Sequence, residues 1–131
     1  MSQENIRLYS KALGCWNRGD VDGFVELMSP EVEIFTALAG VEGSYRGIDG
    51  ARRWHADFHD IFPDWHAEPL SVRSRGDATI AHLRATGHGG SSGTPVEQTM
   101  WHVIHWRDGK AVRISRHESE EEALEAVGLS E

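Results

Sequence analysis

The chain has 131 residues, a length that suits one domain (residues 1–131) around one hydrophobic core, and a formal net charge of −8 argues against nucleic acid and anionic membranes as partners. No apolar run approaches the ~20 residues of a membrane span, and the N-terminus lacks the basic and apolar segments of a signal peptide. The single cysteine, Cys15, cannot form an internal disulfide, so we expect a cytoplasmic protein.

The first half of the sequence predicts helices around one strand. Gly19 has the place of a left-handed cap after the first helix, and Asp20 can cap the second. Asp49 is placed to cap the third helix, which Pro63 ends. Apolar periodicity predicts these elements: helices over 3–18, 21–28 and 50–62, and a strand over 32–36, with a glycine-rich connection over 37–47.

The second half predicts strands and a final short helix. Alternation that breaks at Pro69 is typical of a β-bulge. Asp108 and Gly109 form a strong hairpin signal, because both central turn positions need positive φ. Ser119 and Glu122 make a capping box for the tail helix. The predicted strands cover residues 65–73, 78–88, 96–106 and 111–117.

This order of elements indicates an α+β fold. A hairpin such as 96–117 is not stable alone in water and needs further strands and a covering layer. We expect a cone-shaped, curved antiparallel or mixed sheet wrapped around three N-terminal helices, with a short C-terminal helix. Such a cone has an interior in which a small molecule can bind.

Several segments in this order are similar to one known family. They are 16–22 (WNRGDVD), 29–33 (SPEVE), 45–47 (YRG), 62–64 (FPD), 107–110 (RDGK) and 122–129 (EALEAVGL). The sequence resembles the nuclear transport factor 2-like superfamily, in its SnoaL-like polyketide cyclase branch, which is related to ketosteroid isomerase. The resemblance implies the cone fold and a homodimer that packs through the open face of the sheet. It leaves the chemistry open, because the superfamily includes both enzymes and non-enzymes.

The catalytic residues of two relatives are absent from the matching positions. An ungapped alignment through residues 19–23 places the three working residues of ketosteroid isomerase at Thr36, Ala12 and Trp101. The Arg-x-Asp pair of the epoxide hydrolases of this fold matches only Arg84 and Thr86. Cyclases and dehydratases of this fold use Asp or His, and this chain has eight histidines. A large indole at position 101 would either form the floor of a pocket or fill it.

The strand over 78–88 can face the interior in two ways. In one facing, His82, Arg84, Thr86 and His88 point into the cone toward Trp101. In the other, an apolar row points inward: Ala81, Leu83 and Ala85. The family alignment favours the first facing and apolar patterning favours the second.

On the first facing we expect His82, Arg84 and His88 to be the catalytic residues. The protein would then be a cofactor-independent isomerase, cyclase or dehydratase that acts on an apolar or polycyclic substrate by histidine acid–base chemistry. Arg84 or Tyr45 would hold an oxyanion. The alternative is a non-catalytic ligand-binding or dimerisation module. The residues expected to line the pocket are Trp16, Thr36, Tyr45, Trp54, Phe58, Thr86, Trp101, Val103 and Arg116.

Two further sets of histidines have less support as functional residues. His55 and His59 lie four residues apart on a predicted helix, but they flank its apolar stripe and lack the zinc-protease motif, so we expect no metal site. His102 shares a strand face with Ile104, opposite to Trp101, and is expected on the sheet surface or at an interface.

Overall fold

The computed structural model describes residues 2–35, 45–89 and 93–128, with the side chain of Ser2 excluded. Residue Thr36 and the expected connection up to residue 44 lie outside the described residues. The elements are α1 Ser2–Arg18, α2 Val21–Val25, β1 Met28–Phe35, β2 Tyr45–Arg46, α4 Gly47–Ile61, β3 His66–Arg75, β4 Ala78–His88, β5 Pro95–Arg107, β6 Lys110–His117 and α5 Glu120–Gly128.

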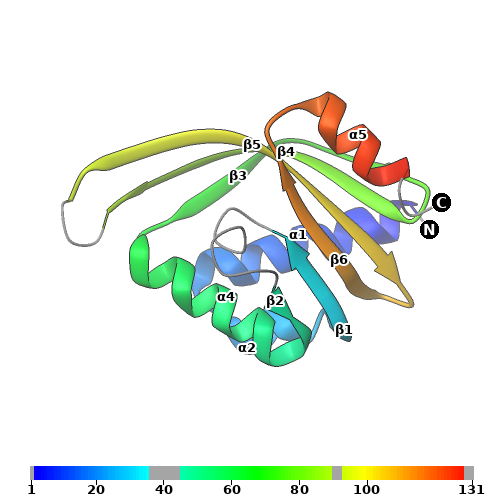
Figure 1. Cartoon of the computed structure of the whole chain (residues 1–131), viewed down its shortest axis with the longest axis horizontal. Helices are drawn as coiled ribbons and strands as arrows, with labels where there is room; N and C mark the ends of the chain where they lie inside the picture. The colour runs from blue at the N-terminus through cyan, green and yellow to red at the C-terminus, as the bar shows by residue number, and fades with distance from the viewer. Residues whose placement is uncertain (1, 36–44, 90–92, 129–131) are drawn as a thin grey trace.

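The strands form one curled six-stranded sheet in the order β2-β1-β6-β5-β4-β3. The β1–β6 pair is parallel, and the other neighbouring pairs are antiparallel. Helices α1, α2 and α4 lie beneath the sheet and α5 lies above it (Figure 1). We call the face toward α1 and α4 the inner face, and the face that carries α5 the outer face. The predicted α+β fold with a mixed sheet is confirmed.

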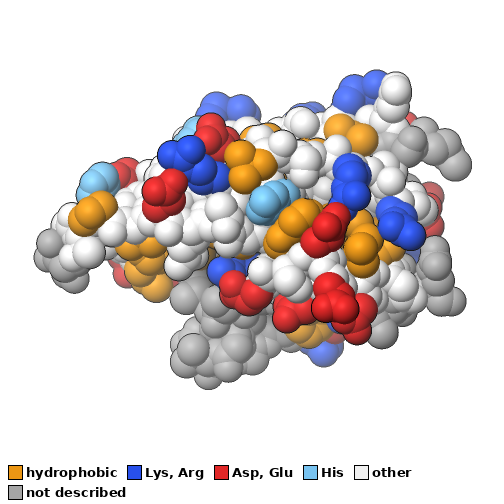
Figure 2. Space-filling view, turned by 90° about the horizontal axis from the view of Figure 1, so that it is seen from above, with side chains coloured by type: hydrophobic (Ala, Val, Ile, Leu, Met, Phe, Trp, Pro, Cys, Tyr) orange, Lys and Arg blue, Asp and Glu red, His pale blue; other side chains and the backbone are white. Residues whose placement is uncertain are grey.

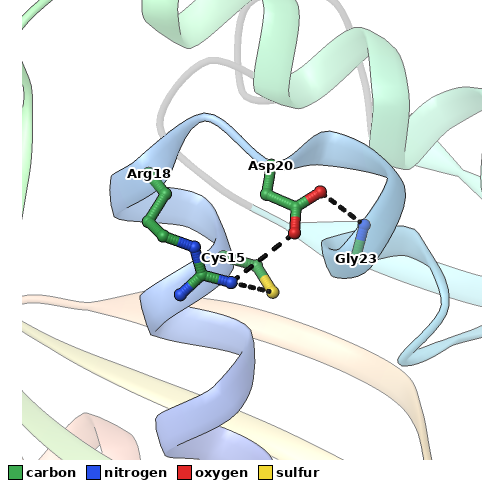
Figure 3. A network of polar contacts seen from close by, with 4 residues as sticks. All are labelled: Cys15, Arg18, Asp20 and Gly23. Atoms are coloured by element: carbon green, nitrogen blue, oxygen red, sulfur yellow. Dashed lines mark hydrogen bonds and ion pairs between the residues drawn. The ribbon is translucent and has the colours of Figure 1, made fainter.

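The turn between α1 and α2 follows the sequence prediction. Gly19 has a φ of +75°, which suits a left-handed cap. The Asp20 carboxylate accepts a hydrogen bond from the Gly23 backbone N–H at 3.0 Å, so Asp20 caps α2 (Figure 3). The Arg18 guanidinium lies 3.5 Å from that carboxylate and 3.4 Å from the Cys15 sulfur. The buried cysteine is therefore part of a packed helix junction.

Helix α4 begins earlier than the sequence indicates. Its N-cap position is Arg46, whose side chain makes no capping hydrogen bond, and Asp49 lies inside the first turn. The prediction that Asp49 caps this helix is therefore wrong. Gly47 has a φ of +70°, and a Cβ there would lie 3.2 Å from the Pro30 carbonyl oxygen. Glycine at this position lets the chain turn from β2 directly into the helix.

The hairpin and bulge predictions are confirmed. The β3–β4 register shifts between Pro69 and Ser71. Asp108 and Gly109 both have positive φ, 54° and 77°, as a two-residue hairpin turn of the primed type requires. Ser119 Oγ accepts a hydrogen bond from the N–H of Glu122 at 3.2 Å, which caps α5.

The buried apolar side chains form two clusters, one on each face of the sheet. The larger lies between the inner face and helices α1, α2 and α4. The smaller joins the outer face to the apolar side of α5, and its members are Ala78, Ile80, Val103, Ala123, Ala126 and Val127. Because α5 covers part of the outer face, strands β4 and β5 carry apolar residues on both faces.

Candidate functional site

A cavity of about 220 Å³ lies between the helices and the inner face of the sheet. Seven Tyr, Trp and Phe side chains line it: Tyr9, Trp16, Phe24, Trp54, Phe58, Phe62 and Trp65. The sheet adds Leu83, Met100 and two isoleucines to its wall. Trp16 lies at the centre of the aromatic group, with ring centroids 4.5 Å from Trp54 and 5.7 Å from Phe58. The cavity therefore offers flat, apolar surfaces that suit a ring compound.

The apolar helix stripes identified from the sequence supply much of this wall. Trp16, Trp54 and Phe58 belong to those stripes and line the cavity. Arg116 on β6, which was also predicted to line the pocket, lies in the cavity wall too. The Arg116 side chain is only 19% exposed, and its guanidinium is paired with the carboxylate of Glu118. A largely buried positive charge is thus part of the wall of a mostly apolar cavity.

His102 is a cavity residue that the sequence reasoning missed. It lies on the inner face of β5 and is paired in register with Arg116 of β6. Burial, followed by the positive charge of Arg116 and the proximity of His117, lowers the pKa of His102 to about 4. The imidazole is therefore uncharged at neutral pH. The prediction that His102 lies on the sheet surface or at an interface is therefore wrong, because its side chain lines the inner cavity.

Strand β4 takes the second of its two predicted facings. Leu83 lines the cavity, so the alternation of the strand turns His82 and Arg84 to the outer face. His82 stacks there on Trp101, with ring centroids 4.2 Å apart and an interplanar angle of 3°. Arg84 pairs with Glu97 at 2.6 Å. The expectation that these two side chains point into the cone is wrong, because the inward row of this strand is apolar.

His88 and Thr86 lie on the exposed outer side near the end of β4. His88 Nδ1 lies 2.7 Å from the Asp64 carboxylate, and its backbone N–H donates to the same group at 2.8 Å. These hydrogen bonds from His88 lower the pKa of Asp64. None of His82, Arg84 and His88 lines the inner cavity. A catalytic role for these three residues remains a prediction.

Three more residues predicted to line the pocket lie elsewhere. Trp101 is on the outer face beside His82, and Val103 is buried beneath α5. The Tyr45 hydroxyl donates a hydrogen bond to Asp57 at 2.9 Å, so it already has a partner. The family alignment placed position 101 inside the cone, whereas the β4–β5 register pairs Trp101 with His82 on the outside.

His55 and His59 are packed in the wall of the helical layer. Their rings stack with centroids 4.0 Å apart, and the His55 ring lies 4.9 Å from that of Trp16. Burial lowers the pKa of His55. Among the described residues, no group of three or more His, Cys, Asp or Glu side chains is arranged to hold a metal ion. The ring contacts place both histidines among the packed aromatic side chains of the helical layer.

The family assignment follows from a family model and agrees with the fold. A model described as a SnoaL-like domain matches residues 9–114. The chain belongs to the SnoaL-like domain family. No curated protein matches the sequence significantly. Within the described residues, no helix has the length and apolar character needed to cross a membrane.

Solved structures of this SnoaL-like fold agree along most of the chain. A protein from Jannaschia sp. CCS1, described as a candidate SnoaL-like polyketide cyclase, has a TM-score of 0.80 and 19% identity over 98% of this chain and 91% of that one. TerC, co-crystallised with polyporic acid, has a TM-score of 0.77 and 20% identity over 95% of this chain and 98% of that one. A hypothetical protein from Catenulispora acidiphila with a ketosteroid isomerase-like fold, in complex with trimethylamine, has a TM-score of 0.76 and 14% identity over 92% of each chain. At these identities the comparison establishes the fold.

Proposed function

We propose that this protein is a cofactor-independent acid–base catalyst, an isomerase, cyclase or dehydratase, for a small and largely apolar ring compound bound in the inner cavity. The observation that carries the proposal is the position of His102, a proton-accepting group in an aromatic cavity. Two structural neighbours support a substrate of this class: TerC, co-crystallised with polyporic acid, and the protein described as a candidate SnoaL-like polyketide cyclase.

His102 has the chemistry to move a proton within the cavity. At neutral pH its ring is uncharged, so one ring nitrogen is free to accept a proton from a substrate carbon. A group with this low pKa is a weak base before the reaction begins. Negative charge that develops on the substrate beside the ring raises the pKa of the imidazole and so favours the transfer. The same proton can then return to a different carbon or leave with a hydroxyl group as water.

A second candidate function is supported by the residues that are absent from the wall. Among the described residues that line the cavity, none is Asp or Glu. A carboxylate is a common general base, so its absence favours a non-catalytic ligand-binding module. The two candidates make the same prediction for binding and different predictions for proton transfer.

We also propose that two copies associate through the part of the outer face that α5 leaves uncovered. Figure 2 shows this face, where hydrophobic side chains lie among acidic, basic and histidine side chains. The partly exposed stack of His82 on Trp101 lies on it and offers an aromatic contact. This association leaves the inner cavity on the other side of the sheet.

The catalytic proposal is tested by exchange of the C2 protons of 1-tetralone in deuterated water, followed by NMR. This bicyclic ketone has acidic protons next to its carbonyl group, so exchange reports proton abstraction without knowledge of the natural substrate. We expect the protein to accelerate exchange, and His102→Phe to reduce that acceleration by at least about tenfold. His82→Phe is the matched control, because it removes a histidine from the opposite face of the sheet.

Exchange by His102→Phe at the rate of the unmodified protein would refute the role of His102. Saturable binding of 1-tetralone without accelerated exchange would favour the non-catalytic module.

A further inference from the structure

Two hydrogen-bond donors in the cavity wall lack partners among the described residues. They are the Tyr9 hydroxyl and the Trp54 indole Nε1, both buried and both without a hydrogen bond. Tyr9 is 3% exposed and Trp54 is 5% exposed, and both residues line the cavity. A buried polar group without a partner is costly, and native proteins leave few of them. Their position suggests that the occupant of the cavity supplies the missing partners.

The chemistry of the two groups sets the polarity of that partner. An indole N–H donates a hydrogen bond and cannot accept one. Burial raises the pKa of Tyr9, so its hydroxyl keeps its proton and is available as a donor. A matching ligand must therefore present acceptors to both groups. A carbonyl oxygen accepts hydrogen bonds and donates none, whereas an ammonium group has no acceptor to offer.

Two other buried residues of the same types, Trp106 and Tyr45, have hydrogen-bond partners within the protein. The Trp106 indole N–H donates to Thr79 Oγ1 at 3.0 Å, and the Tyr45 hydroxyl donates to Asp57 at 2.9 Å. Neither Trp106 nor Tyr45 lines the cavity. The other buried side-chain polar atoms without a partner among the described residues belong to His55, His59, Ser74 and His105, which do not line the cavity. Tyr9 and Trp54 are therefore the members of this group that a ligand in the cavity can reach.

We propose that the cavity selects ring compounds that carry a carbonyl oxygen, such as aromatic ketones or quinones, through hydrogen bonds donated by Tyr9 and Trp54. This inference rests on the proposed binding function and adds the chemical class of the ligand. The apolar wall holds the ring, and the two donors select for the oxygen. Negative charge that moves onto this oxygen during proton abstraction by His102 would meet the same donors.

Calorimetric titration with three related bicyclic probes tests the inference. The probes are 1-tetralone with a carbonyl group, tetralin with none, and 1-aminotetralin with an ammonium group. We expect 1-tetralone to bind about tenfold more tightly than tetralin, and 1-aminotetralin to bind more weakly than tetralin. The ratio of the ketone and hydrocarbon affinities isolates the hydrogen bonds from the apolar contacts.

Variants of Tyr9 and Trp54 test whether these two donors cause the preference for 1-tetralone over tetralin. Tyr9→Phe and Trp54→Phe should each reduce the preference for the ketone by about threefold, and the double variant should bring it close to one. Tyr45→Phe and Trp106→Phe are matched controls that should keep it. Because tetralin binding is measured for every variant, a change in cavity shape or in folding is seen separately.

The outcomes separate the two proposals. A preference for the ketone that persists in the double variant would overturn this inference, as would equal binding of 1-tetralone and tetralin. Either result would leave an apolar binding cavity in place. If none of the probes binds the unmodified protein, the proposed binding function fails as well.

Discussion

The two faces of strands β4 and β5 carry similar residue types but place them in different surroundings. On the inner face, His102 lies in an aromatic cavity, and burial holds its pKa near 4. On the outer face, His82 stacks on Trp101 and remains partly exposed. The difference shows that the strand parity of a histidine decides whether it can meet a ligand in the cavity. The following predictions test this division, from the largest expected effect to the smallest.

Neighbouring residues on β4 should differ most in their effect on stability. Leu83 is fully buried on the inner face, and Arg84 on the outer face is about half exposed. Leu83→Ala should lower the free energy of unfolding by about 3 kcal/mol, because it removes buried methyl groups. Arg84→Ala should cost less than about 1 kcal/mol, because it breaks an exposed ion pair. Urea denaturation at pH 7 measures both, and equal losses would contradict the assigned facing.

Protonation of His102 should destabilise the protein in acid. Its pKa is lowered from 6.5 in the unfolded chain to about 4, so the unfolded state binds a proton more readily between these values. The stabilisation is complete above pH 6.5 and is lost as the pH falls toward 4, by about 3 kcal/mol in total. In His102→Phe this part of the pH dependence should disappear.

Urea denaturation between pH 7 and 4 measures this effect, with His82→Phe as the control from the outer face. Other histidines with lowered pKa, among them His55 and His105, will leave some dependence of the free energy of unfolding on pH in both variants. The same pH dependence of stability in the two variants would show that folding does not lower the pKa of His102.

Disruption of the aromatic stack should affect association of two copies and not the cavity. Trp101→Ala removes the larger ring of the outer stack, and loss of such a central aromatic contact costs about 2 kcal/mol in a typical interface. We expect analytical ultracentrifugation to show a weaker dimer, which dissociates at a higher protein concentration than that of the unmodified protein. Binding of 1-tetralone should be unchanged. Loss of binding with an intact dimer would place Trp101 in the ligand site instead.

The two buried tyrosines should respond in opposite directions to removal of the hydroxyl group. Tyr9→Phe removes an unpaired buried hydroxyl and should stabilise the ligand-free protein by about 1 kcal/mol. Tyr45→Phe removes a hydroxyl bonded to Asp57 and should destabilise it by about the same amount. Thermal unfolding without added ligand measures both, and destabilisation by Tyr9→Phe would indicate that its hydroxyl already has a partner.

The fold could be predicted from the sequence because its signals are local. Helix stripes, the cap at Asp20 and the turn at Asp108 and Gly109 each depend on a few neighbouring residues. The start of α4 could not be predicted in this way. It depends on the positive φ of Gly47 and its approach to Pro30, which is a tertiary contact.

The site could be predicted only in its helical half. Trp16, Trp54 and Phe58 lie on periodic stripes, and these lead directly to the cavity. The facing of β5 could not be read from alternation, because Met100 is buried on one face and Val103 on the other. The apolar side of the tail helix was the one sequence feature that could have indicated the facing of β5. It needs an apolar surface to cover, and that surface is the outer face.

Ring NMR of histidine-labelled protein during titration with 1-tetralone tests the central claim most directly. His102→Phe and His82→Phe assign the two signals. We predict that the His102 signal shifts to saturation as the ligand binds, and that the His82 signal keeps its position. A shift of His82 with no change at His102 would move the ligand to the outer face and contradict the assignment of function to the inner cavity.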